Sequence, residues 1–336
     1  MLDNKEHLVV IGNGPAGNKA ALTLRKNIPD VRITLIDKNC QGFYLPRLLP
    51  DLIAGKIEEA ELYIYAASSY KDRGIKLRCG QAVVDLDLEK RLITLDHREV
   101  VSFTGLIIAA GSKPRIPEKL SIFEDLMYTL KTAEDAGRWI KKLPKVIIGG
   151  DLTSLALTRE LLHLNKQVYF MIDDSAFWPL RVNDELFNEV SEILTQRGVN
   201  VLRCKDIKSM TSLSDDLCQV HINEEILEVG MIGAFFGLVP DIGFLARSGL
   251  TLDRGIIVDE YLNTGFEDVY ATGDCAQIYH PDINDYWVSI GHDNARALGK
   301  TAALNLAGNK VPAEMDQNCI YDVQGINVNT SWWTEF

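Results

Sequence analysis

Two glycine-rich turns in this chain of 336 residues have the residue types that bind phosphate groups. The first turn runs from residue 12 to residue 17 and keeps a G-x-G-x-x-G spacing. In such a turn the first glycine allows a tight bend, the second lets the backbone approach a pyrophosphate, and the third lets a helix pack on the preceding strand. The sequence therefore predicts a dinucleotide site here. The residues expected to contact the ligand are Gly12, Gly14, Pro15, Ala16 and Gly17.

The elements that must hold this turn can be identified on both sides of it. The apolar run 8–11 predicts a strand before the turn, and residues 18–26 predict a helix after it. A second run, 31–36, predicts a strand that leads into Asp37, about twenty residues after the last glycine. An acid at this place accepts the hydroxyl groups of the ribose. We therefore expect Asp37 and its neighbour Lys38 to bind the ligand.

Three further segments resemble one family. Residues 256–260 and 270–274 resemble the second FAD signature of the pyridine-nucleotide-disulfide oxidoreductase superfamily, and residues 106–114 resemble the strand and turn where that family's chain passes between domains. The resemblance implies that the cofactor is FAD and that Asp274 holds its ribityl chain. It also implies that the neighbouring turn residues contact the cofactor: Ala110, Gly111 and Gly273.

Residues 43–56 are most similar to the rubredoxin reductases, ferredoxin reductases, nitrite reductase flavin modules and NADH oxidases of this superfamily. Relatives with a redox-active cysteine carry it on the helix after the first acid, where this chain has Pro46 and only Cys40 nearby. The resemblance therefore predicts flavin chemistry without a thiol. Arg47 is a candidate catalytic residue with two open interpretations: it polarises the flavin, or it faces solvent. The family's helix over 294–306 points toward the flavin pyrimidine, which makes His292 the second candidate.

The second glycine-rich turn, over residues 149–154, departs from the family pattern. The runs 145–148, 155–164 and 167–172 predict an intact strand, helix and strand around it. Asp151, however, stands where the second glycine would allow a pyrophosphate to approach. Two like charges about 4 Å apart repel by roughly 4 kcal/mol at an effective dielectric constant near 20. The residues of this altered nicotinamide-type site are Gly149, Gly150, Asp151, Ser154 and Asp173.

Three interpretations of this second turn stay open. NADH binds through a shifted loop with Asp173 on the ribose, although Ala156 replaces the family's glutamate near the nicotinamide. Alternatively, the unit is a scaffold without a nucleotide, and electrons pass between FAD and a protein partner. In the third interpretation it binds a different ligand.

Composition excludes several classes of function. The net charge of −12 disfavours nucleic-acid binding, and no apolar run is long enough to span a bilayer. The six cysteines contain no CxxC pair and the six histidines no ligand spacing, so we expect no metal. The chain enters its first strand at once, which leaves no room for a signal peptide and predicts a cytoplasmic protein.

These patterns predict an α/β protein with two Rossmann-like nucleotide-binding domains and a truncated C-terminal interface segment. The expected parts are an FAD domain over 1–122 and 241–308, an inserted NAD(P)-type domain over 123–240, and the interface segment over 309–336. Clustered aromatic residues at Trp332 and Trp333 are typical of a tail that contacts a partner or packs on its own domain.

The predicted function is that of an FAD-dependent oxidoreductase that passes electrons between FAD and a redox partner protein or a larger complex. One alternative is an NAD(P)H-dependent reductase or oxidase that uses the second domain, and another is a non-catalytic flavin-bearing subunit. A homo-oligomer is compatible with each.

Overall fold

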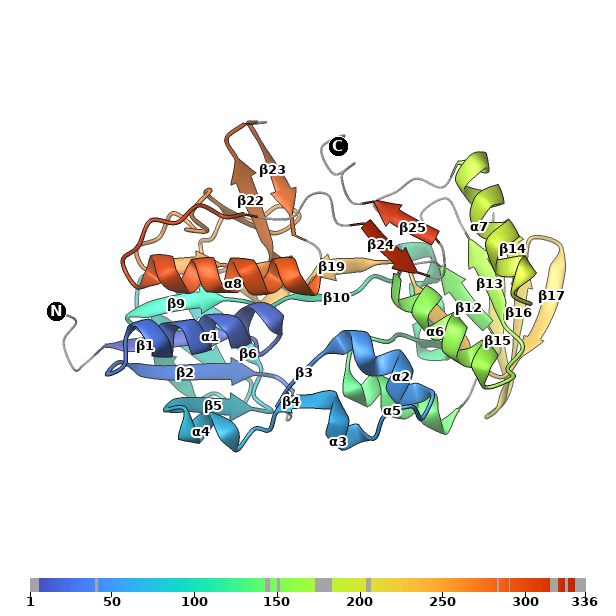
Figure 1. Cartoon of the computed structure of the whole chain (residues 1–336), viewed down its shortest axis with the longest axis horizontal. Coiled ribbons are helices and arrows are strands. Elements are labelled where there is room, and N and C mark those ends of the chain that lie inside the picture. Colours follow the sequence, from blue (N-terminus) through green and yellow to red (C-terminus); the bar gives the residue numbers. More distant parts are fainter. Residues whose placement is uncertain are drawn as a thin grey trace. The chain divides into compact units, whose positions relative to one another are not determined.

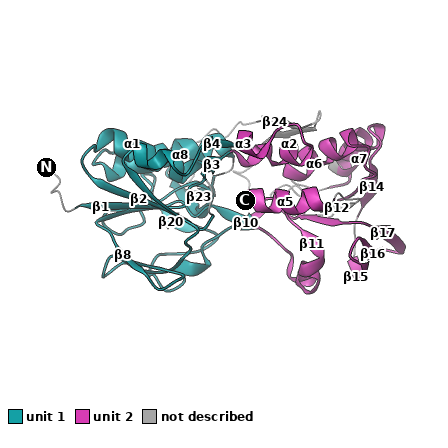
Figure 2. Ribbon diagram, turned by 90° about the horizontal axis from the view of Figure 1, so that it is seen from below, with its two compact units in different colours: residues 1–44, 63–113, 239–317 teal, residues 45–62, 114–238, 318–336 magenta. Residues whose placement is uncertain are grey.

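The computed structural model describes residues 6–39, 42–142, 146–149, 152–172, 183–203, 207–282, 284–289, 291–314, 320–323 and 326–329. The chain divides into two compact units, coloured separately in Figure 2. Unit 1 comprises residues 1–44, 63–113 and 239–317, and unit 2 comprises residues 45–62, 114–238 and 318–336. Each unit contains its own five-stranded parallel sheet. The molecule is thus a mixed α/β protein in which both units have a parallel-sheet core.

The central sheet of unit 1 has the strand order β21-β9-β1-β2-β5, with every neighbouring pair parallel. Its strands are β1 (His7–Ile11), β2 (Arg32–Asp37), β5 (Ile75–Cys79), β9 (Gly105–Ile108) and β21 (Val269–Ala271). All residues of β1 and β9 are buried, because the sheet is covered on both faces. This arrangement brings the carboxyl ends of β1, β2, β9 and β21 to one edge.

Two helices, α1 (Pro15–Asn27) and α8 (His292–Leu306), lie side by side on one face of this sheet (Figure 1). Their close approach depends on Gly299, where an added Cβ would lie 2.1 Å from the backbone oxygen of Ala16. Helix α1 begins at Pro15, three residues before the helix expected from sequence. Proline suits the first position of a helix because it has no N–H to leave unpaired there.

An antiparallel sheet of β6 (Val83–Asp87), β7 (Leu92–Leu95) and β8 (Val100–Ser102) lies on the opposite face, as Figure 2 shows. Its first two strands, β6 and β7, form a hairpin. The remaining elements of unit 1 are β3 (Phe43–Tyr44), β4 (Tyr63–Tyr65), α4 (Ser69–Asp72), β10 (Ser112–Pro114), β19 (Leu238–Pro240), η3 (Gly243–Leu245), β20 (Ile256–Val258), η4 (Gly273–Cys275), β22 (Ala276–His280) and β23 (Asp285–Val288).

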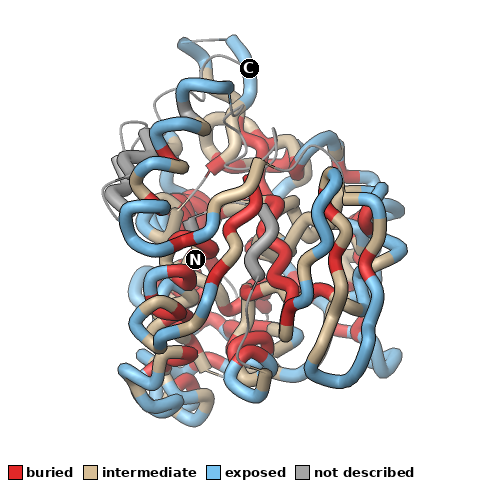
Figure 3. The backbone as a smooth tube through the Cα atoms, turned by 90° about the vertical axis from the view of Figure 1, so that its right-hand side faces the viewer, coloured by how far each residue is buried: buried red, intermediate tan, exposed pale blue. Residues whose placement is uncertain are grey.

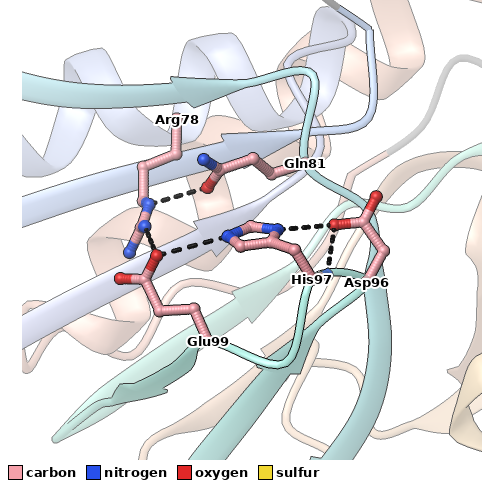
Figure 4. Close-up of polar contacts among 5 residues, drawn as sticks. All are labelled: Arg78, Gln81, Asp96, His97 and Glu99. Atoms are coloured by element: carbon pink, nitrogen blue, oxygen red, sulfur yellow. Dashed lines mark hydrogen bonds and ion pairs between the residues drawn. The ribbon is translucent and has the colours of Figure 1, made fainter.

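A polar cluster joins β5 to the turn between β7 and β8 (Figure 4). His97 lies between two carboxylates, with Nδ1 2.8 Å from Asp96 and Nε2 3.3 Å from Glu99. Arg78 donates to Glu99 and also to Gln81, the latter at 2.8 Å. The hydrogen bonds that the imidazole donates to Asp96 and Glu99 raise the pKa of His97. The cluster therefore favours a protonated imidazole at the protein surface.

The parallel sheet of unit 2 has the strand order β11-β18-β12-β13-β14. Its strands are β11 (Met127–Tyr128), β12 (Val146–Gly149), β13 (Tyr169–Ile172), β14 (Asn200–Arg203) and β18 (Ile232–Phe235). The accompanying elements are η2 (Glu118–Leu126), α5 (Ala133–Lys141), α6 (Leu152–His163), α7 (Asp184–Gln196) and an antiparallel sheet of β15 (Ile207–Ser214), β16 (Leu217–Ile222) and β17 (Glu225–Val229). Figure 3 views the right-hand side of Figure 1, and there buried segments of the backbone alternate with exposed turns.

Residues 45–62 belong to unit 2, whereas the sequence groups them with the first domain. They form η1 (Pro46–Leu48), α2 (Leu49–Ile53) and α3 (Glu59–Leu62), and α2 packs against α5 and α6. Ion pairs add to this packing. Lys56 pairs with the buried carboxylate of Glu160 on α6, and Asp51 lies 3.9 Å from Arg159. These contacts explain the difference, since the segment has its charged partners in unit 2.

Two short strands near the C-terminus, β24 (Ile320–Val323) and β25 (Ile326–Asn329), form an antiparallel hairpin, and β24 lies against α6. Trp332 and Trp333 fall outside the described residues. Within the residues that the structure describes, no helix has both the length and the apolar character needed to cross a membrane.

Candidate functional site

The predicted cofactor-binding segments of unit 1 meet at the carboxyl edge of its parallel sheet. The first glycine turn follows β1, Asp37 ends β2, Gly111 follows β9, and Asp274 follows β21. Neighbouring parallel strands end at the same edge, so the topology brings together segments that are far apart in sequence. This edge is the usual ligand-binding place in open α/β sheets.

The three glycines of the turn have different surroundings. Gly12 has a φ of +97°, which L side chains rarely adopt, and an added Cβ would lie 2.1 Å from the backbone oxygen of Ala109. At Gly17 an added Cβ would lie 1.8 Å from the backbone oxygen of Gly12, so the helix closes directly on the turn. At Gly14, in contrast, a Cβ would meet nothing described within 4 Å. The turn is thus closed on the protein side and open at Gly14.

Asp37 is tied to this turn by its side chain. Its Oδ2 accepts the backbone N–H of Asn13 at 2.5 Å, and its Oδ1 accepts the N–H of Asn39 at 2.7 Å. Burial raises the pKa of Asp37, although these hydrogen bonds act in the opposite direction. The carboxylate therefore fixes the turn and retains lone pairs that can accept hydroxyl groups.

Asp274 lies in η4 beside the turn after β9. Ser112 donates a hydrogen bond from Oγ to Oδ2 of Asp274 at 2.7 Å, and the backbone N–H of Thr272 donates to the oxygen of Ile108 at 2.9 Å. Gly273, with a φ of +73°, approaches α1 so closely that an added Cβ would lie 2.9 Å from the Cβ of Ala16. The two late motifs and the first turn therefore form one connected edge.

One cysteine and two lysine side chains near this edge have partners within the protein. Cys275 is fully buried, its Sγ lies 3.5 Å from the oxygen of Ile108, and burial raises its pKa to about 11. It is therefore a protonated core thiol. Lys38 pairs with Asp241 at 2.6 Å, and Lys113 lies 3.8 Å from the same carboxyl group. The ammonium group of Lys38, the residue after Asp37, therefore forms an ion pair with Asp241 in this structure.

The two candidate catalytic residues lie on elements of different units. His292 is the half-buried first residue of α8 in unit 1, after Gly291 with a φ of +93°. The helix therefore begins two residues earlier than the sequence pattern indicates. Arg47 is exposed on η1, in unit 2.

The second glycine turn is only partly described. Gly149 ends β12 and pairs with Phe235 of β18, and Ser154 is fully buried on α6. Ala156 is half-buried on the same helix. The strand–turn–helix–strand order expected from sequence is present as β12, α6 and β13. Gly150, Asp151 and Asp173 lie outside the described residues.

Sequence reasoning missed two buried polar groups. Tyr70 on α4 places its hydroxyl between Asn13 and Asn18, beneath the first glycine turn. Glu160 is a fully buried carboxylate that contacts Lys56, Arg159 and His163. Neither group is part of a motif, since each depends on a packing partner from a distant segment.

Comparison with known proteins gives one matching family model, described as pyridine nucleotide-disulphide oxidoreductase, over residues 6–295. A nitric oxide reductase FlRd-NAD(+) reductase from Escherichia coli O139:H28 (strain E24377A / ETEC) is 25% identical over 313 residues, which cover 92% of this chain and 81% of that protein. An assimilatory nitrate reductase electron transfer subunit from Bacillus subtilis (strain 168) is 24% identical over 279 residues, which cover 81% of this chain and 36% of that protein.

Solved structures have the same fold. A covalent putidaredoxin reductase–putidaredoxin complex matches with a TM-score of 0.83 at 21% identity, covering 97% of this chain and 81% of the matched chain. The NADH:rubredoxin oxidoreductase of Clostridium acetobutylicum matches with a TM-score of 0.78 at 22% identity, covering 96% and 80%. At these identities the likeness concerns the fold alone.

Proposed function

The chain belongs to the pyridine nucleotide-disulphide oxidoreductase family, and on that premise we propose that it carries electrons between FAD and a redox protein partner. It is an FAD-dependent oxidoreductase. The observation that carries the proposal is the meeting of the first glycine turn, Asp37 and Asp274 at one sheet edge. The names of its relatives support a protein partner, because they refer to flavorubredoxin-type, rubredoxin and putidaredoxin systems.

The residues of this edge suit FAD. The open face of Gly14 and the free N–H groups at the start of α1 favour the diphosphate, since a helix N-terminus attracts negative charge. Asp37 is assigned to the ribose and Asp274 to the ribityl chain. The flanking residues assigned to the cofactor are Gly12, Pro15, Ala16, Gly17, Lys38, Ala110, Gly111 and Gly273. We further infer that both parallel sheets are Rossmann-type nucleotide sheets, of which unit 1 holds the cofactor.

FAD, when bound, supplies reversible hydride and single-electron chemistry, and the protein supplies orientation and charge. The start of α8 carries the positive end of a helix dipole, and we assign His292 and this first turn to the flavin ring. A positive helix end stabilises negative charge on its neighbour. Arg47 keeps its two interpretations, a flavin contact or a solvated side chain.

We propose that turnover needs no cysteine. Cys275 is a buried thiol with a raised pKa, which makes it a poor nucleophile. Cys40, the thiol nearest the family's redox position in sequence, lies outside the described residues. A Cys40→Ser protein is therefore expected to keep its FAD content and its rates of flavin reduction and reoxidation. A large loss of rate with unchanged FAD content would assign the reaction to a thiol.

The identity of the electron donor distinguishes this function from its two alternatives, an NAD(P)H-dependent reductase and a non-catalytic flavin-bearing subunit. An anaerobic titration of the purified protein with NADH and NADPH, followed in the flavin spectrum, tests them together. We expect a yellow protein that either nucleotide reduces poorly and that a reduced redox protein reduces well. Rapid reduction by NADH at micromolar concentration would instead favour an NADH-dependent reductase. A flavin that no donor reduces would favour a non-catalytic subunit.

We place the protein in the cytoplasm, with a redox protein or larger complex as its partner and homo-oligomers as an additional arrangement. Size-exclusion chromatography with and without a rubredoxin-type partner tests the assembly.

A further inference from the structure

Three buried polar side chains meet beneath the first glycine turn. The hydroxyl of Tyr70 donates to Oδ1 of Asn13 at 2.7 Å and accepts a hydrogen bond from Nδ2 of Asn18 at 2.6 Å. The exposed fractions are 1% for Tyr70, 6% for Asn13 and 4% for Asn18. Burial raises the pKa of Tyr70 to about 12, so the hydroxyl keeps the proton that it donates. The network joins α4, the turn and α1.

This network fixes the direction of the Asn13 amide. Because Oδ1 is held by Tyr70, Nδ2 must point away from that hydroxyl. Nδ2 is buried, and no residue in the described part of the chain accepts its hydrogen bond. Buried donors are nearly always paired in folded proteins, so one that is left without an acceptor calls for an explanation.

The position of Asn13 indicates where an acceptor would come from. The residue lies between Gly12 and Gly14, and its backbone N–H donates to Asp37 at 2.5 Å. It is therefore flanked by the open glycine on one side and by the ribose-binding acid on the other. A dinucleotide at this turn brings phosphate and ribose oxygens to this place, and such oxygens are strong acceptors.

We propose that the side-chain amide of Asn13 is a ligand of the ADP half of FAD, and that Tyr70 is the positioning residue that directs it. The inference rests on the assignment of the first glycine turn to FAD. It adds a side-chain contact to a turn whose other contacts come from the backbone. A buried water is the competing partner for Nδ2, and the experiment below separates the two.

The experiment uses the full-length apoprotein and measures the dissociation constants of FAD and ADP by titration. Asn13→Asp keeps an oxygen for Tyr70 but replaces the donor with a carboxylate, and Asn13→Ala removes both. Loss of one hydrogen bond to a charged acceptor weakens binding about 10- to 100-fold. We expect Asn13→Ala to weaken the binding of FAD and of ADP by this same factor. Asn13→Asp should weaken the binding of both ligands at least as much. Tyr70→Phe, which frees the amide, should give a smaller loss.

The matched control is Thr34→Val, which removes a buried hydrogen bond of 2.8 Å to His7 within the same sheet, away from the glycine turn. It should lower the unfolding midpoint without changing either dissociation constant. Equal binding of FAD and ADP by Asn13→Asp, Asn13→Ala and the unmodified protein would assign Nδ2 to a water and overturn the inference. If the unmodified apoprotein binds neither FAD nor ADP, the cofactor assignment itself is wrong, and the inference falls with it.

Discussion

Individual titrating residues give the most direct physical tests of unit 1. His7 on β1 is buried, and its Nε2 lies 2.8 Å from the hydroxyl of Thr34. Burial, with the nearby charge of Arg32, lowers the pKa of His7 from 6.5 to about 4. The unfolded chain therefore binds this proton at a higher pH than the folded chain does. Stability is consequently lost as the pH falls from 6.5 toward 4.

For His7 we expect the wild-type protein to lose about 2 kcal/mol more than a His7→Gln protein between pH 7 and pH 4.5. Glutamine can keep a hydrogen bond to Thr34 but does not titrate. Urea unfolding at the two pH values measures the difference. Parallel losses in the two proteins would show that His7 keeps an ordinary pKa.

The pKa of His97 is shifted in the opposite direction to that of His7, so its contribution to stability depends on pH in the opposite way (Figure 4). The hydrogen bonds to Asp96 and, to a smaller extent, to Glu99 raise its pKa, so the stabilisation is present at low pH and is lost as the pH rises through the folded-state pKa. Because the cluster is exposed, we expect only a small effect on stability. A proton NMR titration should show that Asp96→Asn lowers the His97 pKa more than Glu99→Gln does. A pKa that neither substitution moves would contradict the geometry.

At the scale of elements, Gly14 and Gly17 of the first turn have different roles, the first in cofactor binding and the second in folding. A valine Cβ at Gly14 meets nothing described within 4 Å, whereas at Gly17 it lies 1.8 Å from the oxygen of Gly12. Gly14→Val should therefore fold normally but lose FAD, while Gly17→Val should lose about 3 kcal/mol or more of stability because α1 cannot close on the turn. Thermal unfolding of both apoproteins and FAD titration distinguish them. A Gly14→Val protein that stays yellow would exclude this turn as the FAD site.

Local patterns predicted the elements around this turn well. The alternation of apolar strand, glycine turn and helix located β1, α1 and β2, and the spacing to Asp37 located the acid at the strand end. The boundaries shifted by two or three residues, because Pro15 and Gly291 let α1 and α8 begin earlier. Such capping effects depend on geometry that periodicity does not contain.

Long-range partners could not be predicted in this way. Nothing in the sequence around Tyr70 indicates that its hydroxyl reaches Asn13, and no local pattern indicates that Lys56, in the segment 45–62, pairs with the buried Glu160 of unit 2. Burial alone would raise the pKa of Glu160, but the hydrogen bonds from Lys56, Arg159 and His163 together lower it. A buried carboxylate of this kind is stable only with its partners, and one of them, Lys56, comes from a segment about a hundred residues away.

At the scale of the whole molecule, the two parallel sheets differ in how well they keep their glycine turns. Unit 1 retains all three glycines, whereas the turn of unit 2 has Asp151 and Ser154 in place of the second and third. The surrounding strands and helix are nevertheless present as β12, α6 and β13. A retained scaffold with an altered turn is what we expect if electrons reach the flavin from a protein rather than from a nicotinamide.

The last prediction follows from this contrast: the double change Asp151→Gly with Ala156→Glu should improve reduction of the flavin by NADH about tenfold or more. Removing the carboxylate relieves a repulsion of up to roughly 4 kcal/mol against a pyrophosphate, and glycine allows close backbone approach. Stopped-flow reduction at several NADH concentrations measures the gain, with Ala156→Glu alone as the control for the charge change. Unmodified protein that binds NADH at micromolar concentration and is rapidly reduced would show that unit 2 already binds the nucleotide through a differently shaped loop.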